Sequence, residues 1–323
     1  MQEAMIKRAL ELLESGEVNR VLGWQRGDFS YDVTPAVFTD AEQLRNSLIY
    51  DVFCGANLSK YLVKETVKEG KILVFLKPCD TYSFNQLLSE HRIARDKIYA
   101  IGIPCNGMAD IDRIRAKGIS GIKSIRDNGD TMVIDTIYGE HSISREDALA
   151  VRCLDCKSHK HVAYDELIGD EGEIIENNRF DMVAKLENMT ADERYAFWRN
   201  ELSKCIRCNA CRNVCPACTC EKCVFDNADS GVENKAAANS FEENLFHIIR
   251  AFHVAGRCTD CGECSRVCPS GIPLHLLNRK FIKDINELYG EYQAGEVVNE
   301  RGPLVNYTFD DVEPSIVHER GNK

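Results

Sequence analysis

The sequence predicts an α/β domain followed by a mostly helical, cysteine-rich domain. Two observations predict this order. Continuous apolar runs at residues 72–76 and 98–103 are separated by a helical pattern, which is typical of parallel strands buried on both faces of a sheet. Further along, eight cysteines repeat one spacing twice. We place the α/β domain at residues 1–178, the cysteine-rich domain at 179–293 and an extended C-terminal arm at 294–323.

The other elements of the α/β domain follow from local patterns. We expect helices over residues 2–15, from Asp40 onward, over 57–68 and over 82–90. A strand is expected over 19–24, a short one near Val37, and a hairpin over 122–125 and 131–136. In the second domain, Thr190 and Glu193 form a capping box for a helix that leads into the first cysteine run. The arm is expected to order on a partner subunit, with plain disorder as the alternative.

The eight cysteines form two copies of the pattern C-x2-C-x2-C-x3-C-P. The first copy is Cys205, Cys208, Cys211 and Cys215, and the second is Cys258, Cys261, Cys264 and Cys268. Bacterial ferredoxins bind 4Fe-4S clusters with this spacing. A loop with a cysteine at every third position can hold three corners of the iron cube, so the fourth ligand comes from elsewhere. The second domain is therefore predicted to be a bacterial-ferredoxin-type 4Fe-4S dicluster domain.

In such runs the fourth cysteine of each copy binds the other cluster. We therefore expect one cluster on Cys205, Cys208, Cys211 and Cys268, and a second on Cys258, Cys261, Cys264 and Cys215. Structural zinc is one alternative, but zinc sites normally use two C-x2-C pairs. Disulfides are another, and they require an oxidising compartment. Iron–sulfur chemistry is favoured over both.

A third set of cysteines lies in the α/β domain. Cys79 and Cys105 each follow a predicted buried strand, where open α/β sheets carry ligand sites. Cys153 and Cys156 form a C-x2-C pair further along. Taken singly, Cys79 and Cys105 are equally well explained as packing residues. Taken together, the four thiolates favour a third 4Fe-4S cluster, with zinc as the alternative.

Other polar residues and cysteines allow more than one interpretation. Lys157, His159, Lys160 and His161 are expected in a solvated loop, with compensation of cluster charge or contact with an acidic partner as alternatives. Cys54 is expected to be structural. Cys218, Cys220 and Cys223 are expected to shield a cluster or pack beside it, the alternatives being ligand exchange or a separate metal. His247 and His253 are expected on the helix surface or near a cluster, not as ligands.

Composition excludes several classes of protein. The formal net charge of −11 at pH 7 argues against nucleic-acid binding. It fits docking to basic patches of redox partners, and equally ordinary solubility. The first 16 residues form a charged amphipathic helix, so neither a signal peptide nor a mitochondrial leader is expected. No apolar run approaches the roughly 18 residues that span a bilayer. We expect a cytoplasmic protein with reduced cysteines and no transmembrane segment.

Three stretches together resemble a known family. They are Lys77-Pro-Cys-Asp, Ile101-Gly-Ile-Pro-Cys-Asn-Gly and Arg152-Cys-Leu-Asp-Cys, and the dicluster run follows them. This order resembles the iron–sulfur beta-subunit family of deazaflavin-dependent hydrogenases and formate dehydrogenases. The C-terminal module is also similar to the sulfhydrogenase beta subunit and to the iron–sulfur subunit of anaerobic sulfite reductase. In those relatives, too, the first run continues as Cys215-Pro-Ala-Cys218-Thr-Cys220 does here.

The resemblance implies an electron-transfer subunit of an anaerobic multi-subunit oxidoreductase. Such a protein relays single electrons between a flavoprotein subunit and a hydrogenase, formate dehydrogenase or heterodisulfide-reductase-like partner. In the deazaflavin-reducing proteins, however, the ferredoxin module generally precedes the flavin-binding part. No G-x-G-x-x-G follows a strand here, so FAD or FMN is expected in a partner. The alternatives are a flavin-containing chain that itself reduces a deazaflavin or nicotinamide coenzyme, the iron–sulfur subunit of an anaerobic sulfite reductase, and a scaffold that holds zinc.

Overall fold

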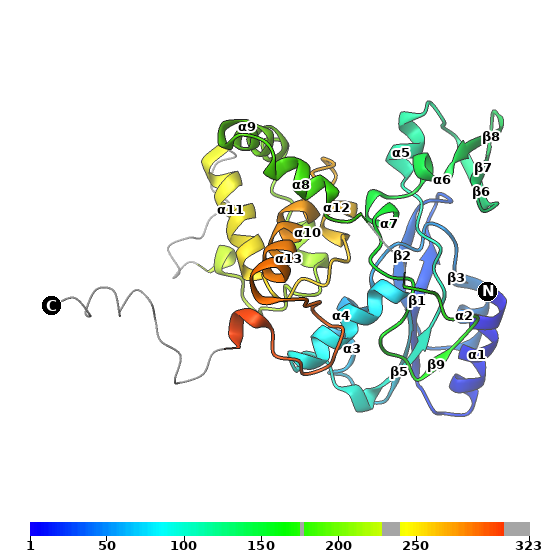
Figure 1. The fold of residues 1–323 in the computed structure, drawn as a ribbon. Coiled ribbons are helices and arrows are strands. Elements are labelled where there is room, and N and C mark those ends of the chain that lie inside the picture. The colour runs from blue at the N-terminus through cyan, green and yellow to red at the C-terminus, as the bar shows by residue number, and fades with distance from the viewer. Residues whose placement is uncertain (175–177, 228–239, 307–323) are drawn as a thin grey trace.

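The computed structural model describes residues 1–174, 178–227 and 240–306. Figure 1 shows two regions, a sheet with its covering helices and a helical region that the chain enters after residue 178. After that point the described chain contains only helices and loops. The predicted fold class, an α/β domain with parallel strands followed by a helical dicluster region, is confirmed.

The main sheet has six strands in the described residues. They are β1 (Arg20–Arg26), β2 (Val33–Phe38), β3 (Leu48–Ile49), β4 (Ile72–Leu76), β5 (Ile98–Gly102) and β9 (Glu166–Leu167). Their order is β2-β1-β4-β5-β9, and β3 pairs with β1. β1, β4, β5 and β9 run parallel, while β2 and β3 run antiparallel to β1. Every residue of β4 is buried, as its unbroken apolar run predicts.

Helices cover both faces of this sheet. They are α1 (Gln2–Glu14), α2 (Ala41–Ser47), the 3-10 turn η1 (Leu58–Tyr61), α3 (Leu62–Glu65) and α4 (Pro78–Ser89). Figure 1 shows α1 and α2 on the side away from the helical region and α4 on the side towards it. The helix expected over 57–68 is shorter and starts as a 3-10 turn. The Asn57 side chain caps this turn, since it accepts a hydrogen bond from the N–H of Ser59.

Helix α4 begins four residues earlier than the pattern predicts. Pro78 occupies its first turn, where a missing N–H costs nothing. The carboxylate of Asp80 accepts a hydrogen bond from the backbone N–H of Lys77 at 3.3 Å, which caps the helix. Cys79 consequently lies in the first helical turn, directly beyond β4. The carboxyl end of the sheet therefore presents this thiol on a rigid element.

A smaller antiparallel sheet extends the first domain. It consists of β6 (Ile122–Asp127), β7 (Thr131–Thr136) and β8 (Gly139–Ser144), so the predicted hairpin is confirmed and gains a third strand. Helices α5 (Ile111–Ala116), α6 (Arg145–Ala148) and α7 (Val151–Leu154) flank it, with a 3-10 turn η2 (Arg95–Lys97) before β5. Ile114, Met132 and Leu149 form a separate small core here. Helix α7 follows this unit in the chain and places Cys153 near Cys79 and Cys105, which follow β4 and β5.

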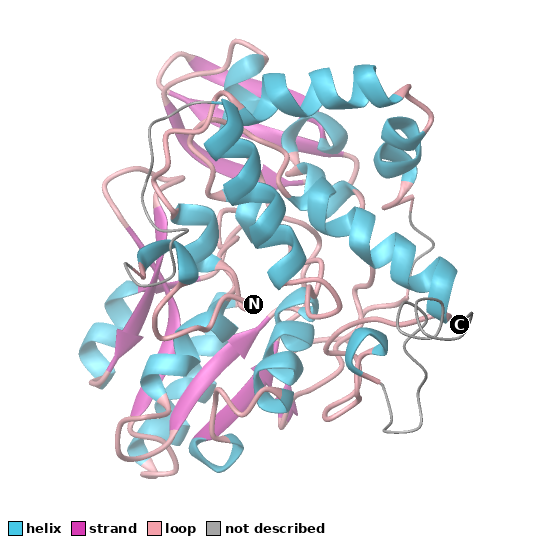
Figure 2. Cartoon of the chain, turned by 90° about the vertical axis from the view of Figure 1, so that its left-hand side faces the viewer, coloured by secondary structure: helices cyan, strands magenta, loops and turns pink. Residues whose placement is uncertain are grey.

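The second region is built from helices, which Figure 2 shows in front of the strands. They are α8 (Asp181–Glu187), α9 (Ala191–Leu202), α10 (Ala210–Val214), α11 (Ser240–His253), α12 (Glu263–Arg266) and α13 (His275–Tyr289), with 3-10 turns η3 (Val224–Asp226) and η5 (Pro303–Val305). The capping box of α9 is confirmed, since Thr190 Oγ1 accepts from the N–H of Glu193. No helix in the described ranges is long and apolar enough to cross a membrane. Residues 307–323 of the predicted arm lie outside the described residues.

Candidate iron–sulfur sites

Both cysteine runs fold into the same backbone turn. The residues on either side of the second cysteine have positive φ: Arg207 and Asn209 at 55° and 60°, Asp260 and Gly262 at 54° and 67°. A short helix that carries the third cysteine follows each turn. The N–H of Arg207 donates to the Sγ atom of Cys205 at 3.4 Å. The sequence repeat is thus a structural repeat, and a curled loop is what three successive cluster ligands require.

The four cysteines predicted for the first cluster line one cavity. They are Cys205, Cys208 and Cys211 from the first run and Cys268 from the second. The cavity encloses about 330 Å³, and Phe246 and Ile272 are part of its apolar wall. Cys208 is exposed, whereas Cys211 is buried. This grouping fits the predicted exchange of fourth cysteines, and the ligand assignment stays a prediction.

The last cysteine of the first run lies among residues of the second. Cys215 is buried and packs with Cys258 and Val254. Burial, followed by the charges of Asp260 and Cys215, raises the pKa of Cys258 well above its usual range. Burial, with the charges of Glu263 and Cys215, raises the pKa of Cys261 to about 12. These thiols hold their protons at neutral pH without a metal, so cluster binding must displace the protons.

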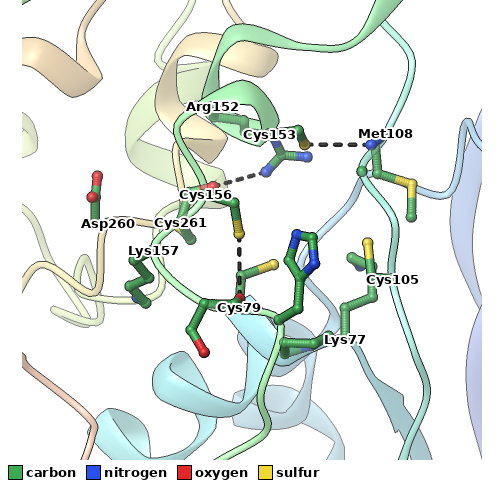
Figure 3. Close-up of a pocket in the computed structure, with 14 residues that line it drawn as sticks. Lys77, Cys79, Cys105, Met108, Arg152, Cys153, Cys156, Lys157, Asp260 and Cys261 are labelled. Carbon is green, nitrogen blue, oxygen red and sulfur yellow. Dashed lines mark hydrogen bonds between the residues drawn. The ribbon is translucent and has the colours of Figure 1, made fainter. Parts of the chain in front are cut away.

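The third set of cysteines also lines a single cavity, shown in Figure 3. Cys79 comes from the start of α4, Cys105 from the loop after β5, and Cys153 and Cys156 from α7 and the turn beyond it. The cavity encloses about 520 Å³, including the part that opens to solvent. The N–H of Met108 donates to Cys153 Sγ at 3.4 Å. Four thiols, partial burial and a backbone donor to sulfur fit a 4Fe-4S cluster.

Buried cations surround this third cavity. Lys77, Arg152 and Lys157 all line it. Lys77 is 1% exposed, and its Nζ atom lies 2.8 Å from Asp80 Oδ2 and over the ring of Trp24. Lys157 contacts the carbonyl of Thr259 and the ring of Tyr82. Positive charge here would offset the negative charge of a 4Fe-4S cluster held by these four thiolates.

The expectation of a solvated loop at residues 157–161 holds for Lys160, which is exposed, and is wrong for Lys157 and His161. Lys157 lines the cavity, and His161 is buried. The ring of His161 lies within hydrogen-bonding distance of Glu171 and of the carbonyl oxygens of Leu76 and Ile103. These contacts fasten the loop across the carboxyl ends of β4 and β5. A charged side chain such as Lys157 can be buried when it finds partners, and no local pattern signals this.

The geometry bears on the zinc alternative. Within residues 1–174, 178–227 and 240–306, no three His, Cys, Asp or Glu side chains converge closely enough to hold one metal ion. Zinc requires this convergence, because its sulfur ligands all lie about 2.3 Å from a single ion. A 4Fe-4S cube places each thiolate on a different iron, so its ligands stand further apart.

The remaining cysteines divide into two groups. Cys54 is fully buried in the main core, accepts from the N–H of Asp51 at 3.2 Å and lines neither cysteine cavity. Cys218, Cys220 and Cys223 line a different cavity, beside the first run. The thiol of Cys218 hydrogen-bonds with Cys215, and this bond lowers the pKa of Cys215 and raises that of Cys218. This contact is the one expected of a shielding residue.

Several charged residues beside the cysteines were missed by sequence reasoning. Arg250 is buried and donates to the carbonyl of Cys211 at 3.1 Å. Glu263 is fully buried and binds both Arg152 and Arg266 at 2.6 Å. Arg279 binds Asp260 at 2.8 Å. The position of Asp260 and Glu263 between cysteines of the second run could have indicated that they lie near a cluster site. For Arg250, the only clue in the sequence is a charged residue within an apolar helix.

Comparisons with known proteins agree with this geometry. The family model of the 4Fe-4S dicluster domain matches residues 201–272. The F420-dependent formate dehydrogenase subunit beta of Methanocaldococcus jannaschii is 24% identical over 91% of this chain and 92% of its own length. The F420-dependent formate dehydrogenase 1 subunit beta of Methanococcus maripaludis is 25% identical over 68% of this chain and 73% of its own length.

Over most of its length the chain is similar to these beta subunits, and its cysteine-rich region matches the dicluster domain. The resemblance seen in the cysteine motifs is thereby confirmed. The dicluster domain implies two 4Fe-4S clusters, so members with this domain are iron–sulfur redox subunits. In a solved structure of the F420-reducing NiFe hydrogenase complex from Methanosarcina barkeri, one chain is similar at 13% identity with a TM-score of 0.41. That likeness covers 62% of this chain and 86% of that one.

Proposed function

We propose that this chain relays single electrons inside a multi-subunit oxidoreductase, between a flavin-containing subunit and a hydrogenase, formate dehydrogenase or heterodisulfide-reductase-like partner. The observation that carries the proposal is the third cavity. Four cysteines of the α/β domain line it together with Cys261 of the dicluster domain. The proposed third cluster site therefore lies beside Cys261, which is a proposed ligand of the second cluster.

Three ligand sets are proposed. Cys205, Cys208, Cys211 and Cys268 form the first, Cys258, Cys261, Cys264 and Cys215 the second, and Cys79, Cys105, Cys153 and Cys156 the third. A bound 4Fe-4S cluster accepts and releases one electron at a time. The chain contributes burial, hydrogen bonds to sulfur and nearby charge, which set the potential at each site. The names of the relatives, F420-dependent formate dehydrogenase beta subunits, support this class of complex.

The test is anaerobic analysis of iron, sulfide and flavin in the purified chain. Three clusters predict about twelve irons per chain, falling to about eight when Cys153 and Cys156 are both changed to Ser. Cys220→Ser is the matched control, because Cys220 is exposed and does not line the third cavity. About eight irons in the unchanged protein would remove the third cluster. Iron loss in the control equal to that in the double variant would show that the effect is not specific.

A second candidate is that the chain itself binds flavin and reduces a deazaflavin. A cavity of about 1510 Å³ lies between β1, β2, η1 and the first cysteine run. Tyr61, Lys64 and Arg92 line it, beside Val37. The volume includes the part that opens to solvent, and Glu65 and Glu221 line the cavity as well. Apolar walls with nearby cationic groups suit an aromatic anion. A yellow chromophore released by acid precipitation would favour this candidate, and its absence with full iron content would favour the pure relay.

A further inference from the structure

Arg152 lies between the third cysteine cavity and the second ligand set. It precedes Cys153 in the sequence and lines the third cavity. Its Nη1 atom donates to the carbonyl oxygen of Cys261 at 2.8 Å, a contact drawn in Figure 3. The same atom donates to Glu263 Oε1 at 2.6 Å, and Nη2 donates to the carbonyl of Gly55 at 2.7 Å. One buried side chain thus contacts both domains.

The contact is tightly fitted. The Arg152 side chain is 7% exposed and Glu263 is completely buried. Gly262 has φ +67°, and a Cβ atom there would lie 2.6 Å from the Cβ of Arg152. Only glycine lets the second cysteine loop approach so closely in this conformation. Glu263 also accepts from the N–H of Asn57 at 3.2 Å, which ties the same loop to the α/β domain.

The first ligand set adjoins the second in a different place. Arg250 donates to the carbonyl of Cys211, which belongs to the first set. The charges of Cys215 and Cys264, which belong to the second set, act on the same guanidinium. No residue of the first run or Cys268 lines the third cavity, whereas Asp260 and Cys261 of the second run do. The second set therefore borders both of the others.

We propose that Arg152 is a positioning residue that joins the third site to the second, so that the three sites form one series with Cys215, Cys258, Cys261 and Cys264 in the middle. The two ends of the series are then the α/β domain and the first set, where Cys208 is exposed. This inference rests on the proposed function, because it requires the third cluster. Each electron that passes is lost by one site and gained by the next, with no bond made and no proton moved.

The proposal predicts a specific effect on reduction potentials. A cation between two sites stabilises the more negative, reduced state of both. Replacing Arg152 by Gln removes this charge and weakens the tie to Cys261. We expect two of the three one-electron steps to move to lower potential in an EPR-monitored titration. The step that disappears in the Cys153→Ser/Cys156→Ser protein must be one of the two, and Arg152→Lys, which keeps the charge, must shift both steps less.

Arg266→Gln is the control. Arg266 binds the same Glu263 at 2.6 and 2.8 Å but neither contacts Cys261 nor lines the third cavity. It should leave the third site's step unchanged. If Arg152→Gln fails to accumulate with its iron, Arg152→Met decides, because it also removes the charge and an unshifted pair of steps in that variant overturns the proposal. The proposal is also overturned if Arg152→Gln shifts only one step, all three steps or none. About eight irons in the unchanged protein would instead show that the proposed third cluster itself is absent.

Discussion

The ring of His247 lies against Cys205, with its Nε2 atom 3.3 Å from the sulfur. Burial lowers the pKa of His247 to about 3, so the imidazole is neutral at pH 7. Nε2 then donates its proton to the sulfur, since a thiolate can only accept. Hydrogen bonds to sulfur stabilise the electron-rich, reduced cluster. We therefore expect His247 to help set the potential of a cluster bound at the first site, without being a ligand.

We predict that His247→Phe lowers the potential of the first cluster. A differential stabilisation of about 1.4 kcal/mol, typical of a hydrogen bond to a charged group, corresponds to about 60 mV for one electron. The measurement is an EPR-monitored redox titration. His253→Phe is the control, because His253 is exposed on the same helix. Equal shifts in the two variants would show that the His247 hydrogen bond does not set the potential.

Arg279 and Asp260 form a buried ion pair that we expect to be important for stability. Both side chains are at most 2% exposed, and Arg279 also reaches Asp155 of the first domain. Arg279→Met leaves the carboxylate of Asp260 buried with less compensation, which should lower the free energy of unfolding by about 3 kcal/mol. Arg126→Ala, in a pair whose side chains are 64% and 62% exposed, should change it by less than about 1 kcal/mol. Urea unfolding under anaerobic conditions measures both, and similar losses would contradict the account.

Gly262→Ala tests the close approach of Arg152 to the second cysteine loop. Gly271 is the comparison, because it also has positive φ but no atom lies within 4 Å of a Cβ placed there. Gly271→Ala should cost only backbone strain, about 1–2 kcal/mol. Gly262→Ala adds a clash and should reduce the iron content as well. If iron content and stability fall equally in the two variants, the clash with Arg152 has no consequence.

Loss of the clusters should loosen the cysteine loops and spare the sheet. The helices that carry Cys211 and Cys264 have only five and four residues, too short to be stable without their surroundings. β4 is buried and paired on both sides. After anaerobic removal of iron, hydrogen exchange should accelerate at residues 205–215, 258–268 and 153–161 while β4 and β5 stay protected. Unchanged exchange at residues 153–161 would count against the third cluster.

Patterns that repeat at short range could be predicted from the sequence. The buried strands β4 and β5 and the spacing of the eight run cysteines needed no tertiary information. In α11, Phe252 is 59% exposed, whereas the neighbouring residues Phe246 and His247 are buried. The cysteine loops impose that choice, because Cys205 and Cys211 pack against this helix. Contacts such as Arg152 with Cys261, 109 residues apart, cannot be read from any local pattern.

We propose that one chain holds three clusters in series. Stoichiometric anaerobic reduction of the iron-replete chain, followed by EPR, tests it most directly, because each cluster takes up one electron. We expect three electrons per chain, and two when Cys153 and Cys156 are changed to Ser. Two electrons in both proteins would contradict it and leave the four cysteines of the α/β domain without a cluster.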